Sequence, residues 1–340
     1  MSSAIKVSLR SFDDGVRQAY ARLFAGDPDK SPEMLRWRFQ RNPHGAAKFA
    51  VAVADEIVVG MIALVPTKLR STTGEVLGYQ AIDTMVDPAC RGQGLFVKLG
   101  AIAQDPAQLG GAALWGLPNA SAARGWYGHL GWINFGPVPM LIRPLRSGFV
   151  LRRLHKALQA MDFPLVGSTH DRFDPLDRDA LGGFDDLWNS IKPRLGTSVE
   201  RSAEWLRWRL YDKPEANYRV VGVLRSAQLD AVVATRISDK HGARLCYFMD
   251  ALAQPGQSER LASMVRSELA NAAGNGAEAA FAWCPPHAPS YAAYRRAGFI
   301  PFPARLRPIE INFGARALTG QADAALAAPW TISLLDSDTN

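Results

Sequence analysis

The sequence predicts an α/β (α+β) protein in which a domain-sized unit occurs twice. The chain has 340 residues, and one ordinary domain takes about 100–200 residues. Hydrophobic residues make up 48% of the chain and charged residues 21%, a balance typical of globular proteins with a packed core. A segment of the first half recurs in the second half. Strand-like and helix-like stretches follow each copy in the same order, which indicates a duplicated domain.

The recurring segment reads SPEMLRWRF at residues 31–39 and SAEWLRWRL at residues 202–210. Pro43 and Pro214 follow the two copies at the same offset. The tryptophans of the segment, Trp37 and Trp208, fall on predicted helices, where a tryptophan packs in the core more often than it lines a site. We expect core packing as the general rule and keep Trp37 as a candidate substrate-binding residue.

Alternating and apolar stretches place the elements of each half in order. In the first half they predict antiparallel strands over 48–54, 57–69 and 76–86, a helix over 93–104, a strand over 112–117 and a helix around 120–130. In the second half they predict strands over 218–224, 229–237 and 243–253, a helix over 257–273, a strand over 278–284 and a helix over 290–298. We therefore predict domains at 1–146 and 171–316, a connector with one short helix at 147–170, and a tail at 317–340.

Positive charge is concentrated in the first half. Residues 1–170 contain 19 Lys and Arg against 12 Asp and Glu, a balance of +7, whereas residues 171–340 contain 20 of each kind. The excess predicts an anionic partner for the first half. Solvated surface charge is the alternative explanation, and composition alone does not separate the two.

Several classes of protein are disfavoured by the sequence. It contains no apolar run of about 18 residues, the length that a membrane helix needs, and its first residues lack a secretion signal. We therefore expect a cytoplasmic protein without a membrane partner. Three widely spaced cysteines, Cys90, Cys246 and Cys284, argue against a disulfide framework and a zinc site, and we expect no metal.

A glycine-rich turn within residues 83–96 (DTMVDPACRGQGLF) carries the clearest chemical signal. A predicted strand runs through a proline into a basic turn and then into a helix. Glycines let the backbone approach a ligand closely, the helix N-terminus presents unbonded N–H groups, and Arg91 adds positive charge. The pattern predicts a pyrophosphate cradle. It has neither the Gly-Lys-Ser/Thr of a Walker loop nor the glycine spacing of a Rossmann fingerprint.

Two further motifs follow the turn: Asn119 after the next predicted strand, and Tyr127 in the helix that ends at Gly131 and Trp132. Together with V-x-P-x-x-R-G-x-G at residues 86–94, this order resembles the GNAT superfamily of acyl-CoA-dependent N-acyltransferases over residues 5–145. The second half resembles the same family more weakly. The resemblance implies two tandem GNAT-like domains, each a mixed, mostly antiparallel central sheet flanked by helices, with a degenerate C-terminal copy.

The resemblance implies that the strand end and the turn bind acetyl-CoA or another acyl-CoA as co-substrate. Backbone groups at the strand end would contact the thioester and the pantetheine arm, and the turn would hold the pyrophosphate. The implied cofactor-binding residues are Met85, Val86, Arg91, Gly92, Gln93, Gly94 and Asn119. Phe96 departs from the family pattern, which has a small residue at that position.

Other side chains are candidates for catalysis or for contact with the acceptor. The resemblance implies that Tyr127 protonates the departing CoA thiolate. Asp83, on the strand that enters the turn, is the candidate base, and a structural cap or ion pair is the alternative role. A backbone N–H at the strand end would stabilise the oxyanion. His44, in the loop after the first copy of the repeat, joins Trp37 as a candidate substrate-binding residue.

The second half lacks the basic turn. If Asp83 aligns with Asp250, Ser258 takes the place of Arg91 and the acidic Glu259 takes the place of a glycine. This is the wrong chemistry for a diphosphate, so we expect one active site per chain, in the first half. Tyr294, which aligns with Tyr127, is expected to be a relic or a packing residue.

These observations lead to one functional hypothesis and two alternatives. The hypothesis is transfer of an acetyl or other acyl group to the primary amine of a small molecule by direct attack on the thioester, with a nucleotide-linked amino sugar as a candidate acceptor. An amino acid, a polyamine and a peptide N-terminus stay open. The alternatives are an aminoacyl-tRNA-dependent transferase of the Fem type and a non-catalytic acyl-CoA-binding module. We expect no nucleic-acid partner, and a homodimer is left open.

Overall fold

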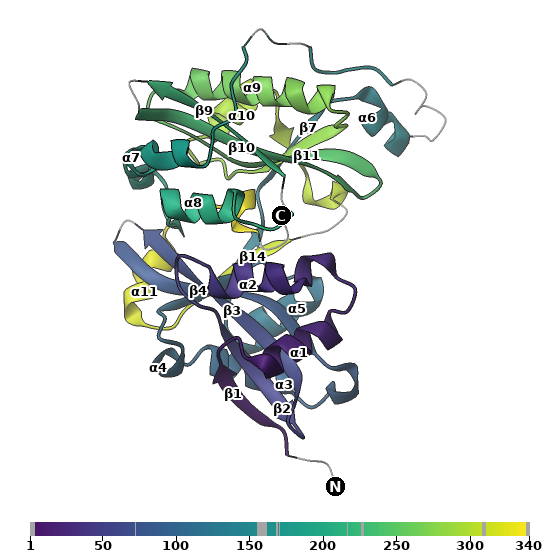
Figure 1. Cartoon of the computed structure of the whole chain (residues 1–340), viewed down its shortest axis with the longest axis vertical. Coiled ribbons are helices and arrows are strands. Elements are labelled where there is room, and N and C mark those ends of the chain that lie inside the picture. The colour runs from purple at the N-terminus through teal and green to yellow at the C-terminus, as the bar shows by residue number, and fades with distance from the viewer. Residues whose placement is uncertain are drawn as a thin grey trace.

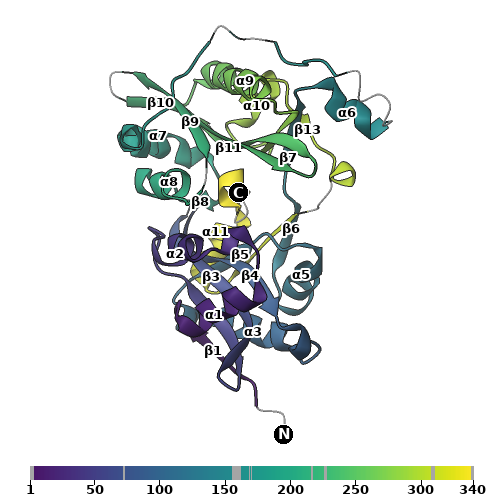
Figure 2. The same cartoon turned by 45° about the vertical axis from the view of Figure 1, so that its right-hand side comes forward.

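The computed structural model describes residues 4–71, 73–154, 162–167, 169, 171–215, 217–225, 228–307 and 311–337. Two β-sheets follow one another along the long axis of the molecule, and the C-terminal segment lies between them (Figures 1 and 2). Within the described ranges, the helices are all too short or too polar to cross a membrane.

The first sheet has eight strands in the order β1-β2-β3-β4-β5-β14-β6, with β8 paired to β3. Its strands are antiparallel to their neighbours except at β4 and β5, which are parallel. They span Lys6–Arg10 (β1), Lys48–Ala54 (β2), Ile57–Ser71 (β3), Gly74–Val86 (β4), Ala113–Gly116 (β5), Ile133–Pro137 (β6), Ser198–Val199 (β8) and Asn312–Ala317 (β14).

Helices cover both faces of the first sheet. Successive residues of a strand point to opposite faces, so Phe49 and Val51 pack with α1 and α2 while Ala50 and Ala52 pack with α3 and α5. The helical segments span Asp14–Leu23 (α1), Pro28–Lys30 (η1), Pro32–Gln40 (α2), Pro88–Cys90 (η2), Leu95–Ala103 (α3), Pro106–Leu109 (α4), Ala120–Arg124 (α5) and Gly125–His129 (η3, a π-helical turn).

The second sheet has six strands in the order β13-β7-β12-β11-β10-β9, with β11 and β12 parallel. Helices α9 and α10 pack on one face, and α7 packs on the face toward the first half (Figure 1). The strands span Met140–Pro144 (β7), Tyr218–Arg225 (β9), Gln228–Lys240 (β10), Ala243–Ala253 (β11), Ala279–Trp283 (β12) and Ile300–Pro301 (β13). The helical segments span Ser147–Leu154 (α6), Asp179–Gly183 (η5), Phe184–Ile191 (α7), Lys192–Arg194 (η6), Ala203–Leu210 (α8), Ser258–Gly274 (α9), Tyr291–Arg296 (α10), Ala304–Leu306 (η7), Gly320–Ala327 (α11) and Leu334–Asp336 (η8). Two mixed sheets flanked by helices confirm the predicted fold class.

The two halves exchange one strand each. Strand β7 leaves the first half and lies between β12 and β13, and β14 leaves the second half and lies between β5 and β6. The corresponding positions of both sheets are therefore filled by a strand from the other half. The predicted boundaries after residues 146 and 316 separate β7 and β14 from the sheets in which they pair, because strand pairing is not visible in sequence order. The division into domains stays a prediction.

The recurring segment forms the contact between the halves. Trp37 on α2 and Trp208 on α8 stack with ring centroids 4.7 Å apart and an interplanar angle of 16°. Both side chains are buried within a core cluster that joins the two halves. The C-terminal segment closes the same region, because Arg209 on α8 donates to the carbonyls of Leu335 and Ser337.

Most of the predicted elements are present. The predicted strands 48–54 and 243–253 coincide with β2 and β11, and the predicted helix 257–273 differs by one residue at each end from α9. The short helix of the predicted connector is α6, and residues 155–161, 168 and 170 of that connector lie outside the described residues. Some strands were not predicted, because each is too short for its alternation to stand out: β1, β6, β7, β8, β13 and β14.

Candidate active site

A cleft opens in the first sheet where β4 and β5 part. The two strands pair over Gly78–Gln80 and Ala113–Trp115, after which β5 ends while β4 continues to Val86. The exposed edge of β4 borders a cavity of about 440 Å³. Its lining comes from the two strand ends, from α5 and η3, and, in the second half, from Trp283, Ile311 and Ser337. The second half therefore completes a cleft that the first half begins.

Asp83 forms a kink in β4 and has partners on both carboxylate oxygens. Its φ of +48° lies in the left-handed region, beside a shift of register in the pairing of β4 with β3. Oδ1 accepts from Lys30 Nζ at 2.5 Å, Oδ2 accepts from the Tyr20 hydroxyl at 2.8 Å, and Arg38 Nη1 lies 4.0 Å from Oδ2. The carboxylate lines the cleft, yet these contacts favour the structural role that sequence reasoning held as the alternative.

The backbone after the kink distinguishes Met85 from Val86. The Asp87 N–H donates to the Val59 carbonyl at 2.8 Å, and hydrogen bonding in an antiparallel ladder alternates from residue to residue. The N–H and C=O of Val86 are therefore directed away from β3, toward the cleft edge, while those of Met85 face β3. The Val86 carbonyl accepts from Arg91 Nε at 3.3 Å.

The turn at residues 91–94 has the geometry expected of an anion cradle. Gly92 and Gly94 have φ of +81° and +69°, which favours glycine, and a Cβ on either residue would meet no atom within 4 Å. Arg91 and Gln93 are exposed. Helix α3 begins at Leu95 without a side-chain cap, so its first N–H groups are available to a ligand. The open space, the uncapped helix and the exposed guanidinium fit a CoA pyrophosphate.

The unusual Phe96 is accommodated by a glycine opposite it. A Cβ on Gly125 would lie 2.2 Å from Phe96 Cε1, so the ring occupies the space that a larger residue would need. Phe96 also packs edge-on against Trp126, with centroids 5.4 Å apart. Its bulk is thereby directed toward η3.

Asn119 and Tyr127 take positions that their motif alone did not predict. Asn119 lines the cleft and caps α5, because its Oδ1 accepts from the Ala122 N–H at 3.0 Å. In the π-helical turn that follows, the Leu130 N–H donates to the Gly125 carbonyl, and Trp126 lines the cleft while Tyr127 does not. Tyr127 packs against β14, where a Cβ on Gly314 would lie 2.5 Å from its ring.

The Tyr127 hydroxyl is buried and has no hydrogen-bond partner in the described part of the chain. Burial raises its pKa to about 12, so the phenol is protonated at neutral pH. It can therefore serve as a proton donor if it turns toward the cleft, and its role as the acid stays a prediction.

His44 and Trp37 lie between the halves and are not among the residues that line the cleft. His44 Nδ1 accepts from the Lys68 N–H at 3.2 Å, and its ring stacks on Trp205 with centroids 6.3 Å apart. Burial and the charge of Lys68 lower its pKa to about 4. Trp37 is 2% exposed, in agreement with core packing. Because neither residue lines the cleft at β4 and β5, the geometry does not support the prediction that they bind the acceptor.

Sequence reasoning missed the cleft residues that come from distant segments. Phe24, Trp283 and Ser337 line the cavity, and Lys30 contacts Asp83. Trp283 is next to last in the predicted strand 278–284 and ends β12, and the carboxyl end of a strand is a usual position for a site residue. The sequence carried no comparable signal for Phe24 or Ser337.

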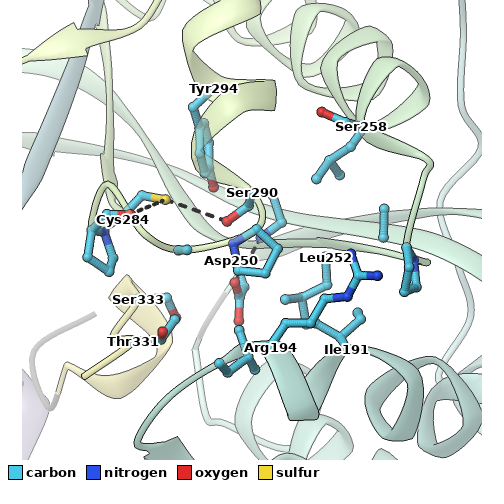
Figure 3. A pocket seen from close by; sticks show the side chains of 18 of the residues that line it. Ile191, Arg194, Asp250, Leu252, Ser258, Cys284, Ser290, Tyr294, Thr331 and Ser333 are labelled. Carbon is cyan, nitrogen blue, oxygen red and sulfur yellow. Dashed lines mark hydrogen bonds between the residues drawn. The ribbon is translucent and has the colours of Figure 1, made fainter. Parts of the chain in front are cut away.

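The second half has a smaller cavity at the corresponding place (Figure 3). Strands β11 and β12 pair over Leu245–Phe248 and Ala279–Ala282 and then part, leaving a cavity of about 170 Å³. Tyr294 is 2% exposed and packs edge-on against Phe248 and Phe299, which agrees with a packing residue. In the described residues, no group of three or more His, Cys, Asp or Glu side chains is placed to hold a metal ion.

Comparison with known proteins finds no matching family model and no matching curated protein. Solved structures do match over most of the chain. N-myristoyltransferase of Saccharomyces cerevisiae with bound myristoyl-CoA is 11% identical, with 91% of this chain and 82% of that chain covered and a TM-score of 0.59. A GCN5-related N-acetyltransferase from Anabaena variabilis is 10% identical, with 93% of this chain and 73% of that chain covered and a TM-score of 0.63. A second one, from Kribbella flavida, is 14% identical, with 95% of this chain and 74% of that chain covered and a TM-score of 0.61. The chain therefore has a GNAT-like fold over most of its length.

Proposed function

We propose that this protein is an acyltransferase that moves an acyl group from acyl-CoA to the primary amine of a small molecule. The observation that carries the proposal is the parting of β4 and β5 beside a glycine turn that leads into the uncapped N-terminus of α3. This places an anion cradle next to a cleft with a free backbone edge. The similar structures include an N-myristoyltransferase with bound myristoyl-CoA and GCN5-related N-acetyltransferases, which supports the same reading.

The reaction would use the chain as follows. Arg91, the two glycines of the turn and the first amides of α3 hold the diphosphate. The Val86 N–H stabilises the negative charge that develops on the thioester oxygen as the amine nitrogen attacks the carbonyl carbon. The C–N bond forms, the C–S bond breaks, and the thiolate takes a proton, for which Tyr127 is our candidate donor. Asp83 is our candidate for accepting the amine's proton, in competition with Lys30 and Tyr20.

The acceptor is proposed from the lining of the cleft. Trp126, Trp132 and Trp283 contribute indole rings to it, and such rings stack on sugar and base faces. Asp83 is the one carboxylate among the lining residues, and it already contacts Lys30, so the cleft offers little attraction to a polyamine. We propose that the acceptor is a nucleotide-linked amino sugar and that the transferred group is an acetyl or longer acyl group. We propose that the reaction takes place in the cytoplasm.

The test combines binding with turnover. Acetyl-CoA and longer acyl-CoAs should raise the melting temperature of the protein, and CoA thiol release should follow when a nucleotide-linked amino sugar is added. Arg91→Glu and Gly94→Val should lose both effects. Gly256→Val is the matched control, because Gly256 has φ of +86° in the corresponding loop of the second half. If no acyl-CoA raises the melting temperature, the proposal is wrong.

A second candidate is a non-catalytic acyl-CoA-binding module. It is favoured by the positions of Asp83 and Tyr127, because the first has partners on both oxygens and the second is buried away from the cleft. Stabilisation by acyl-CoA without thiol release, over a broad panel of amines, would support this candidate over the transferase.

A further inference from the structure

The cavity of the second half is built from several separate parts of the chain (Figure 3). Its walls come from the ends of β11 and β12 with the loops that follow them, from α9 and α10, from the end of α7 with the segment after it, and from the C-terminal segment at Thr331–Ser333. Ile191, Leu252 and Leu261 supply apolar surface, while Arg194, Asp250 and Ser290 supply polar groups. Apolar walls with a few converging polar groups are typical of small-molecule sites.

The inner end of this cavity carries an excess of negative charge. Arg201 is 2% exposed and is shared by two carboxylates, with its Nε 3.1 Å from Asp250 Oδ2 and its Nη2 3.0 Å from Asp336 Oδ2. One guanidinium therefore faces two acids. Arg201 and Asp250 both line the cavity, whereas Asp336 lies behind them and does not. Burial raises the pKa of the Asp250 carboxyl group. A cationic group of a ligand next to Asp250 would balance the charge.

The outer end of the cavity carries positive charge. Arg194 lines it and has neither an ion pair nor a hydrogen bond to any part of the chain that the structure describes. Ser258, in the N-terminal turn of α9, lines the cavity too, and the cap residue of this helix, Gln257, makes no side-chain hydrogen bond. A guanidinium and unbonded N–H groups that line one cavity suit a carboxylate. The Glu259 side chain of the same turn forms an ion pair with Arg296.

We propose that this cavity binds a small α-amino acid, with the ammonium group at Asp250 and the carboxylate at Arg194 and the first turn of α9. The two charges of the ligand then meet the two ends of the cavity. The cavity volume of about 170 Å³ leaves room for a short apolar side chain along Leu252 and Leu261.

This site is separate from the acyl-CoA cleft. The two cavities have one lining residue in common, Trp283. The loop before α9 lacks the paired glycines and the arginine of the turn at residues 91–94, and the cavity has less than half the volume of the cleft. The inference does not depend on the proposed acyl transfer.

The test is titration calorimetry on the full chain with glycine, L-alanine, L-valine and L-leucine, without acyl-CoA. At least one of these is expected to bind. Propionate keeps only the carboxylate of alanine, and ethylamine keeps only the ammonium group. Each should bind at least tenfold more weakly than alanine. Arg194→Gln and Asp250→Asn should each weaken binding at least tenfold. Arg244→Gln is the control, because Arg244 is an exposed arginine on β11 that is paired with Asp239, and it should leave binding unchanged.

Clear outcomes would overturn the proposal: no amino acid binds, the one-ended analogues bind equally well, Arg194→Gln has no effect, or CoA competes for the site. Arg194 is exposed, so its substitution tests the site even if Asp250→Asn does not fold. Because no acyl transfer is measured, failure of the proposed acyltransferase activity would leave this result unaffected.

Discussion

Trp37 and Trp208 each donate the indole N–H to the backbone carbonyl of the other, at 2.8 Å and 3.1 Å. The residues occupy the same position in the two copies of the repeated segment. Their contact is therefore reciprocal. The two copies of the repeated segment, on α2 and α8, form part of the contact between the two halves of the molecule. The two copies of the segment therefore pack against each other across the contact between the halves.

Replacing Trp37 with Phe should destabilise the fold. The change removes one donor and leaves the buried Trp208 carbonyl unpaired, which costs about 1–3 kcal/mol. Trp208→Phe should cost a similar amount by symmetry. Urea unfolding of both single variants and of the double variant would measure the coupling between them. The exposed Phe135, changed to Leu, is the control, and strictly additive losses would contradict a reciprocal contact.

His44 should make stability depend on pH. Its pKa falls from 6.5 to about 4 on folding, so the unfolded chain takes up the proton first as pH falls. Stability should then be highest above pH 6.5 and decline between pH 6.5 and pH 4, by at most roughly 3 kcal/mol. His44→Gln, which keeps an acceptor for the Lys68 N–H, should flatten the decline. His129→Gln, at an exposed position, should leave it unchanged.

Gly125→Ala should destabilise the first half. The new Cβ would lie 2.2 Å from Phe96, and overpacking of this kind costs about 1–3 kcal/mol. Phe96→Leu in the same chain should recover part of the loss. Gly128→Ala provides a matched control in the same turn, because a Cβ there meets nothing within 4 Å. Equal melting temperatures for the two alanine variants would refute the contact.

Lys213→Met should stabilise the protein at neutral pH. Burial, together with the charges of Arg209, Arg38 and Arg236, lowers the pKa of Lys213 from 10.5 to about 5. The folded chain therefore holds a neutral amine where the unfolded chain binds a proton, and stability should rise with pH between about 5 and 10.5. Methionine at position 213 should raise the melting temperature at pH 7. It should also make the stability depend less on pH between about 5 and 10.5. Lys98→Met, on the exposed side of α3, is the comparison.

The sequence predicted what depends on local pattern. Alternation defined β2 and β11 to the residue, and the glycine turn at 91–94 has the open, positive-φ geometry expected from its composition. These features depend on neighbours within a few positions, which a single sequence displays.

The sequence did not predict what depends on distant contacts. The exchange of β7 and β14 brings together strands that are far apart in the chain. The orientation of Tyr127 follows from a π-helical turn beside Gly314 of the exchanged strand, and the partners of Asp83 come from α1 and η1. The sequence pattern around residues 83 and 127 does not indicate which distant residues contact them.

The exchanged strands also set the order in which the protein can mature during synthesis. The sheet that bears the proposed acyl-CoA cleft lacks the strand between β5 and β6 until residues 312–317 have left the ribosome. The surface against which Tyr127 packs is therefore translated only after every strand of the second sheet. A nascent chain interrupted anywhere before β14 would carry the glycine turn without the finished cleft, so the cleft can be completed only after β14 has been translated.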